Sequence, residues 1–196
     1  MGTMTAANTA TALPFGQPLT ISDLAEMPDD GHRYELLDGV LIVSPAPSWP
    51  HQEAQGSLLV QLRQACTPQF RVLGAPFAVW PADDKTELQP DVLVARYDDL
   101  THAGLPTAPV LAVEILSPST ALIDLNLKKA AYERFGAQSY WVIHPLTPAL
   151  FVYERGDNGE YHQRAHVIGD EPFHATQPFA ITIVPNKLIA GLNPTS

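Results

Sequence analysis

The sequence VLAVEILSPST, residues 110–120, places a single acid, Glu114, inside an apolar run. The apolar side chains around Glu114 occupy odd and even positions alike. This pattern is typical of a strand that is buried on both faces of an α/β sheet. A carboxylate in such a strand is costly unless it is paired, hydrogen-bonded or bound to a metal ion. The stretch therefore predicts a central strand whose acid has a partner.

A second apolar strand is expected upstream, in QPDVLVA at residues 89–95, and it begins with Asp91. Adjacent strands lie about 4.8 Å apart, so the carboxylates of Asp91 and Glu114 can share one hard cation. Mg²⁺ and Mn²⁺ prefer such oxygen ligands, and the backbone carbonyl of Ile115 offers another. The two strands therefore predict a divalent-metal site.

A helix over residues 122–135 is expected to follow the central strand and to end at Gly136. Asp124, Lys128 and Tyr132 recur on one of its faces at spacings of four. A lysine beside two acids and a metal can orient a water molecule, help to deprotonate it, or stabilise charge on a phosphorane-like transition state. An adjacent stripe is expected to face the core, formed by Ile123, Leu127, Ala131 and Phe135.

A hairpin is expected over residues 32–45, because two strand-like runs flank Asp38-Gly39, a dipeptide favoured in type I′ turns. Glu35 lies inside the first strand, and a solvent-facing position for it is about as plausible as a functional one. Helices are also expected over residues 20–27 and 48–66, and the second has His51 in its first turn. Further strands are expected at two places within 70–80 and at 139–144, 149–154, 161–167 and 178–184, before a short helical turn.

The length and composition of the chain indicate one globular domain over residues 17–196, preceded by a flexible tail over residues 1–16. Of the 196 residues, 45% are hydrophobic and 16% are charged, which is typical of a chain that buries a core. The one cysteine excludes an internal disulfide and a cysteine-based zinc cluster. No signal peptide and no membrane-spanning run are seen, so a cytoplasmic protein is expected.

The net charge of −10 argues against a nucleic-acid partner, because phosphate neutralisation supplies most non-specific affinity for DNA. A small basic patch, or a divalent ion that offsets the acids, would reconcile this charge with DNA binding. Simpler interpretations also exist for single residues. Asp91 is a plausible turn cap, and Asp124 with Lys128 a plausible surface ion pair. The residues alone therefore indicate no more than a divalent-metal site.

Several separated motifs add a resemblance: RYELLDGVLIVSPAP, then His51, QPDVLVA, LAVEILSPST and DLNLKKAAYERFGAQSYWVI. In this order they resemble the Uma2 family of restriction-endonuclease-like proteins, a branch of the PD-(D/E)XK nuclease superfamily. The resemblance covers residues 34–143. It implies an α/β (α+β) fold with a restriction-endonuclease-like core, in which helices flank a mixed central sheet. It also implies a hydrolytic site for Mg²⁺ or Mn²⁺ and a homodimer.

The resemblance also implies roles for single residues. Pro90-Asp91 matches the PD element, Glu114 matches the second acid, and Glu35 matches an early acid on the hairpin. The lysine of the superfamily motif would fall at Leu116, whose side chain has no amine. The resemblance implies that Lys128 of the following helix supplies the lysine instead. Supporting positions in the substrate groove or around the metal site are expected for His51, Gln89, Asp124 and Tyr132.

Three functions follow as hypotheses. The first is a metal-dependent endonuclease that hydrolyses DNA phosphodiesters, with Asp91, Glu114, Lys128 and Glu35 in its active site. The second is a dimeric binding protein that keeps the nuclease fold with weak or no catalysis, a reading favoured by the acidity and by Leu116. The third is a hydrolase of small phosphoesters.

Overall fold

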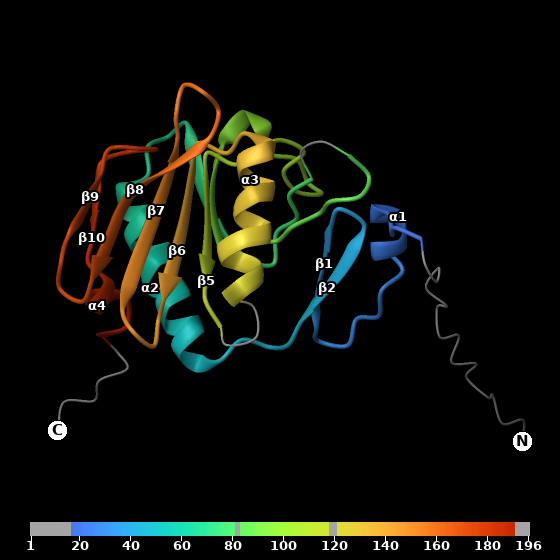
Figure 1. The fold of residues 1–196 in the computed structure, drawn as a ribbon, viewed down its shortest axis with the longest axis horizontal. Coiled ribbons are helices and arrows are strands. Elements are labelled where there is room, and N and C mark those ends of the chain that lie inside the picture. Colours follow the sequence, from blue (N-terminus) through green and yellow to red (C-terminus); the bar gives the residue numbers. More distant parts are fainter. Residues whose placement is uncertain (1–16, 81–82, 118–120, 191–196) are drawn as a thin grey trace, which may run out of the picture.

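A mixed sheet forms the centre of the molecule, as the family resemblance implies, and it has six strands (Figure 1). The computed structural model describes residues 17–80, 83–117 and 121–190, so the predicted tail lies outside the described residues. The strands run in the order β3-β4-β5-β6-β7-β8, and only β5 and β6 are parallel to each other. Their bounds are Phe70–Gly74, Val92–Arg96, Leu111–Ile115, Ser139–His144, Ala149–Arg155 and Tyr161–Ile168.

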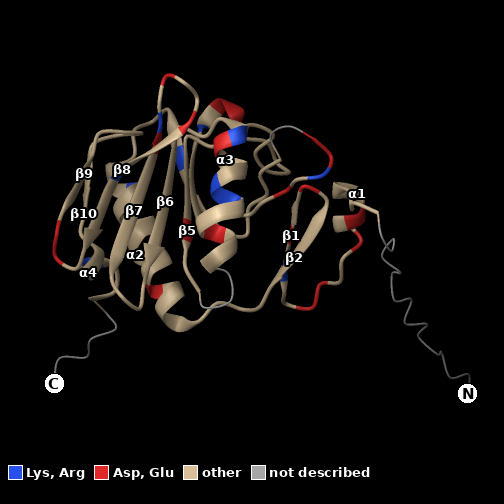
Figure 2. Cartoon of the chain, viewed as in Figure 1, with Lys and Arg blue, Asp and Glu red and all other residues tan. Residues whose placement is uncertain are grey.

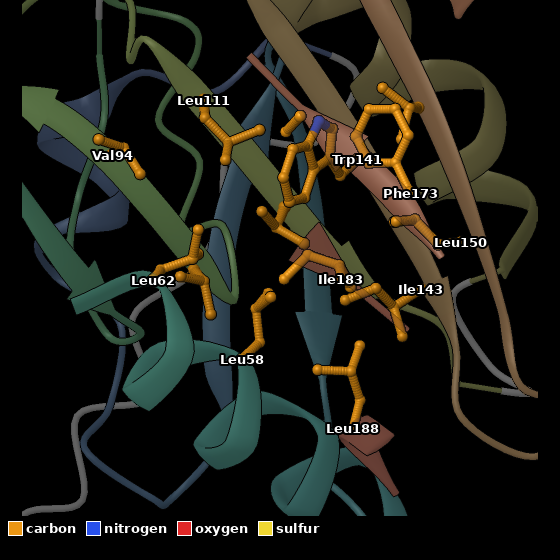
Figure 3. Packing of buried hydrophobic residues seen from close by; sticks show 14 of the residues in the cluster. Leu58, Leu62, Val94, Leu111, Trp141, Ile143, Leu150, Phe173, Ile183 and Leu188 are labelled. Carbon is orange, nitrogen blue, oxygen red and sulfur yellow. The ribbon is translucent and has the colours of Figure 1, made fainter. Parts of the chain in front are cut away.

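Helix α2, Trp49–Ala65, covers one face of this sheet. Its apolar residues recur at spacings of four, so Ala54, Leu58 and Leu62 lie on one side of the helix and are fully buried. They pack against side chains of β4, β5 and β6, among them Val94, Leu111, Trp141 and Ile143 (Figure 3). The short helix α4, Pro185–Leu188, adds Leu188 to the same core.

Replacing Leu58 with alanine is expected to lower the free energy of unfolding by about 2–5 kcal/mol, because a fully buried leucine leaves a cavity. Val60 lies on the same helix and is 54% exposed, so Val60→Ala is expected to change it by less than about 0.5 kcal/mol. Urea unfolding of both variants measures the difference. Equal effects would contradict the packing of α2 against the sheet.

A helical connection between β5 and β6 covers the opposite face. It contains a π-helix, Ile123–Lys128, and continues as α3, Lys129–Phe135, up to Gly136 in the left-handed conformation. The predicted apolar stripe is wrong at Leu127, which is 57% exposed, whereas Asp124 and Lys128 are buried. A π-helix takes more residues per turn than an α-helix, so the side chains before α3 are rotated out of the expected phase.

The β1–β2 hairpin forms a separate two-stranded sheet, Arg33–Leu37 and Val40–Ser44, beside α3 (Figure 1). Its turn is the predicted two-residue one, since Asp38 and Gly39 have φ values of 50° and 79°. Two backbone hydrogen bonds of 2.8 Å between Leu36 and Glu87 join the hairpin to the segment before β4. Helix α1, Ile21–Leu24, packs on it and begins with the capping box of Thr20 and Asp23.

The remaining elements lie at the far end of the sheet. Strands β9, Phe173–Ala175, and β10, Ile181–Ile183, pair with each other and close over the core that α2 forms. The second strand predicted within residues 70–80 is wrong, because only isolated bridges of Val79 occur there. None of the helices in the described part of the chain combines the length and apolarity that a membrane span needs.

Candidate active site

The neighbouring ends of β4 and β5 bring two acids together. The antiparallel register pairs Val92 with Val113, so its continuation by one residue sets Asp91 opposite Glu114 on the same face of the sheet. Both residues are at most 2% exposed. The other residues of these strands are mostly apolar. The two acids lie at the end of the strands that is next to the hairpin and the β5–β6 connection. The sheet therefore places two carboxylates within one buried cluster.

Lys128 connects this sheet to the hairpin. Its Nζ lies 2.9 Å and 3.0 Å from the two carboxylate oxygens of Glu35 and 3.2 Å from Oε1 of Glu114. Oδ1 of Asp124, one turn earlier, lies 3.7 Å from the same amine. Glu35 is fully buried, so the solvent-facing alternative is wrong. It also accepts a 2.8 Å hydrogen bond from the backbone N–H of Gln89.

Asp91 has a different set of partners. Its Oδ1 accepts a 2.8 Å hydrogen bond from Arg33, and its Oδ2 lies 3.0 Å from Nε2 of His51. The backbone N–H of Ile115 donates to the same Oδ2 over 2.8 Å. Burial alone would raise the pKa of Asp91, but the hydrogen bond and charge of His51, together with Arg33, lower it to about 2. Asp91 is therefore ionised at neutral pH.

The cluster has more acids than obligate cations. Four carboxylates, those of Glu35, Asp91, Glu114 and Asp124, face the ammonium of Lys128 and the guanidinium of Arg33. Burial raises the pKa of Glu114 well above its usual range, and although Lys128 opposes this, the nearby acids reinforce it. The same carboxylates raise the pKa of Lys128 despite its burial. The site thus stabilises added positive charge.

A cavity of about 770 Å³ opens beside the cluster. Asp91, Arg33 and His51 reach its wall directly. The rest of the wall comes from the N-terminal segment, the hairpin, the start of α2 and the loop after β3. A volume of this size is typical of pockets that enclose a small molecule or one unit of a polymer. Of the four carboxylates in the cluster, that of Asp91 therefore borders the cavity, and the others lie behind it.

The other predicted positions fall into three groups. His51 lies against Asp91 as described, while Gln89 meets the cluster with its backbone and donates its side-chain amide to the carbonyl of Tyr34. Tyr132 is fully buried and stacks on Tyr140, whose hydroxyl donates to the carbonyl of Asp124. For Ile115 the described contact is through its N–H, and the metal-binding role of its carbonyl stays a prediction.

Two polar residues of the site are not anticipated from the sequence. Arg33 contacts Asp91 and also lies 3.5 Å from Glu35, two positions along the same strand and therefore on the same face. The spacing of two in the run RYE therefore already indicated that Arg33 lies on the same side of the strand as Glu35. Gln55 donates to the backbone carbonyl of Asp91 over 2.8 Å from the second turn of α2. Its position four residues after His51 places both on one face of that helix.

A metal site made from three or more His, Cys, Asp or Glu side chains is not found in the part of the chain that the structure describes. Magnesium, however, is commonly bound through one or two carboxylates and retains several waters. Asp91 and Glu114 fit that requirement, and the excess of acids in the cluster favours a divalent cation.

Comparison with known protein families shows which family the chain belongs to. The model of the Uma2 family, described as "Putative restriction endonuclease", matches residues 21–184. The chain belongs to the Uma2 family. This match includes the hairpin, both acidic strands and Lys128, and it confirms the resemblance drawn from the motifs. A search of curated proteins returned no match.

A solved structure supports the fold independently. It is the crystal structure of a protein from Anabaena variabilis described as a "putative nuclease belonging to DUF820". The two structures agree with a TM-score of 0.71 over 90% of this chain and 100% of the other, at 22% sequence identity. A nuclease-like α+β fold is thereby confirmed for the Uma2 chain.

Proposed function

We propose that this Uma2 protein is a Mg²⁺- or Mn²⁺-dependent endonuclease that hydrolyses phosphodiester bonds in DNA. The convergence of Asp91, Glu114, Glu35 and Lys128 beside an open cavity is the observation that carries the proposal. Membership of a family described as "Putative restriction endonuclease" supports a nucleic-acid substrate. Acids, an amine and a cavity together meet the requirements of metal-assisted phosphodiester hydrolysis.

In this proposal Asp91 and Glu114 hold the divalent ion, with the carbonyl of Ile115 as a third protein ligand. The ion supplies Lewis-acid stabilisation of the phosphoryl oxygens and a water of lowered pKa. Lys128 positions the attacking water and offsets negative charge that develops on the phosphate. Glu35 holds the Lys128 amine in place, and Arg33 and His51 hold the carboxylate of Asp91.

A second candidate rests on the same contacts. Lys128 already lies against Glu114, and Arg33 already lies against Asp91, so the protein's own cations neutralise part of the donor set. Such a site favours a nuclease-fold protein that binds its ligand with weak or no cleavage. Hydrolysis of a small phosphoester is a third candidate that the size of the cavity alone would permit.

Endonuclease activity is tested directly with circular DNA, because a circle without ends is linearised only by internal cleavage. Purified protein is expected to convert circular single-stranded DNA or supercoiled plasmid into nicked and linear forms when Mn²⁺ or Mg²⁺ is present. A chelator is expected to stop the reaction, and added Mn²⁺ to restore it. Persistence of intact circles at saturating metal would favour the non-catalytic candidate.

A homodimer is part of the proposal, since closed two-fold assemblies are the commonest oligomers and the Uma2 resemblance implies one. Light scattering during size-exclusion chromatography is expected to give twice the mass of one chain. The monomer mass across the accessible concentration range would remove dimerisation from the proposal.

A further inference from the structure

The edge of the molecule that α2 and β3 form carries a local charge opposite to the net charge of the chain. We propose that Arg63 and Arg71 on this edge bind phosphates of the DNA backbone and hold the DNA beside the active-site cavity. This inference rests on the proposed nuclease function and names the surface that holds its substrate. It is carried by the distribution of acids, by the contacts of the two guanidinium groups, and by the path of the edge toward the cavity.

The cavity beside Asp91 does not supply the cations that DNA requires. Of the described residues that line it, only Arg33 is an arginine or lysine, and its side chain already donates to Asp91. Acidic side chains gather in the same region, around α1, β1 and β2 (Figure 2). Residues 23–38 alone contain six carboxylates and no cation except Arg33. Because phosphate neutralisation supplies much of the affinity for DNA, a DNA ligand of this chain requires cationic contacts on another surface.

The longest acid-free stretch of the chain supplies such a surface. No aspartate or glutamate occurs between Glu53 and Asp83, although the chain has 21 acids against 11 lysines and arginines. This stretch includes most of α2, the whole of β3, and both Arg63 and Arg71. In a chain with a net charge of −10, the α2–β3 edge is therefore locally cationic.

Arg63 and Arg71 line one pocket of about 410 Å³, which we call the arginine pocket, and no aspartate or glutamate is among the described residues that line it. Nε of Arg63 donates to the carbonyl of Val72 over 3.2 Å. Nη1 of Arg71 donates to the carbonyls of Pro68 and Phe70 over 2.8 Å and 2.7 Å. These neutral acceptors orient the guanidinium groups, and they leave the positive charge and several N–H donors available for a ligand.

Both guanidinium groups are free to meet an external anion. Within the part of the chain that the structure describes, the ion pairs of arginine side chains include neither Arg63 nor Arg71, and both residues are exposed. The Arg71 guanidinium lies 4.3 Å from the centre of the Tyr97 ring, which holds it without neutralising it. Asp98 and Asp99 follow Tyr97 on the 3-10 helix but lie outside the lining of the arginine pocket. Oriented guanidinium groups of this kind suit bidentate binding of phosphate.

The α2–β3 edge connects the arginine pocket to the active-site cavity. Helix α2 lines the cavity with Gln55 and the pocket with Arg63, and β3, the outermost strand, runs back from the pocket toward Ala75 on the cavity wall. At the rise of a helix and of a strand, the paths from Gln55 to Arg63 and from Arg71 to Ala75 are about 12 Å and 13 Å long. Phosphates of one strand recur about every 3.4 Å along the duplex axis, so the pocket lies about four base pairs from the cavity. One DNA molecule can therefore contact both.

The salt dependence of binding tests the charge of this surface. A fluorescently labelled duplex that exceeds this span is titrated with the full chain in chelator at several salt concentrations, with anisotropy as the readout. The double variant Arg63→Gln/Arg71→Gln is expected to bind about tenfold more weakly at low salt. Its slope of log K against log salt is expected to be shallower by about two, one for each lost phosphate contact.

Two outcomes of this titration overturn the inference. One is a wild-type chain that does not bind the duplex at any salt concentration. The other is an unchanged affinity and slope in the double glutamine variant, which would leave an acidic polypeptide as the ligand that fits this edge.

Two control variants separate a local contact from general effects of charge and structure. Arg164→Gln removes an exposed arginine from β8, at the opposite edge of the six-stranded sheet, and is expected to leave affinity and slope unchanged. Arg63→Lys/Arg71→Lys keeps both charges and is expected to keep the slope, with a smaller loss of affinity because bidentate contacts are lost. A shallower slope in Arg164→Gln, or a lysine variant as shallow as the glutamine variant, would overturn the inference.

Cleavage separates this inference from the function on which it rests. With Mn²⁺, the double glutamine variant is expected to cut plasmid more slowly than the wild type at low DNA concentration and equally fast at saturation, because the arginines bind and do not catalyse. DNA binding that depends on the arginines, without any cleavage by the wild type, would defeat the proposed nuclease activity and leave this surface standing. Wild-type cleavage by the double variant at every DNA concentration would keep the nuclease and overturn the surface.

Discussion

Asp91→Asn and Glu114→Gln are each expected to lower metal-dependent cleavage by about a thousandfold. These substitutions keep the shape of the side chain and remove the anionic oxygen that the proposed metal requires. A bound divalent ion supplies several kcal/mol of transition-state stabilisation, and about 4 kcal/mol corresponds to a thousandfold. Initial rates of circular-DNA cleavage at saturating Mn²⁺ measure the effect, and isothermal titration with Mn²⁺ measures the accompanying loss of metal affinity.

Asp98→Asn is the matched control, because Asp98 is exposed on the 3-10 helix that follows β4 and lies away from the cavity. It removes the same charge from the chain and is expected to leave the rate within about twofold, as for surface substitutions in general. Circular dichroism verifies that each variant is folded. Wild-type rates in both site variants would remove Asp91 and Glu114 from the mechanism.

Lys128→Met is expected to cost about 3–5 kcal/mol of unfolding free energy, because it leaves buried acids without their cation. The Lys128 side chain is 2% exposed, and its ammonium contacts Glu35 and Glu114, both of which are also buried. Lys129→Met is the control from the next position. That ammonium lies 4.3 Å from the centre of the Tyr153 ring, and its loss is expected to cost about 0.5–1 kcal/mol. Urea denaturation measures both values.

A double variant tests the cause. If unpaired carboxylates produce the loss in Lys128→Met, then adding Glu114→Gln removes one of them and is expected to restore about 1–3 kcal/mol, a coupling typical of contacting pairs. Simple addition of the two single effects would show that packing of the lysine stem, rather than its charge, stabilises the fold. A loss of cleavage in Lys128→Met at temperatures where the variant stays folded supports its proposed role at the phosphate.

The strands and the hairpin were predictable because their signals are local. Apolar runs define β4 and β5, and Asp38-Gly39 fixes both the turn and the register of β1 and β2. Glu114 was expected to have a partner because an acid in a fully buried strand requires compensation, and the structure gives it one. Its pairing with Lys128 follows the family motif, and the structure brings the two groups to 3.2 Å.

What the sequence did not reveal depends on contacts distant along the chain and on backbone irregularity. Arg33 lies 58 residues from Asp91, and no periodic pattern links two residues so far apart. The π-helix changed which side of the β5–β6 connection is buried, and a stripe counted with α-helical spacing therefore misplaced Leu127. The loop around Val79 resembles a strand in composition, but it makes only isolated bridges.

The separate β1–β2 sheet is expected to unfold more easily than the six-stranded sheet. Glu35 and Arg33 belong to a two-stranded ribbon that is not hydrogen-bonded into the six-stranded sheet, whereas Glu114 lies on β5 of that sheet and Asp91 immediately precedes β4. A two-stranded ribbon is barely stable on its own and depends on the surface that it packs against. Local unfolding of this ribbon would separate Glu35 and Arg33 from their partners in the cluster. The amide hydrogens of the main sheet would meanwhile continue to exchange slowly. Heat or mild denaturant would then break the ion pairs between the ribbon and the sheet before the main sheet unfolds.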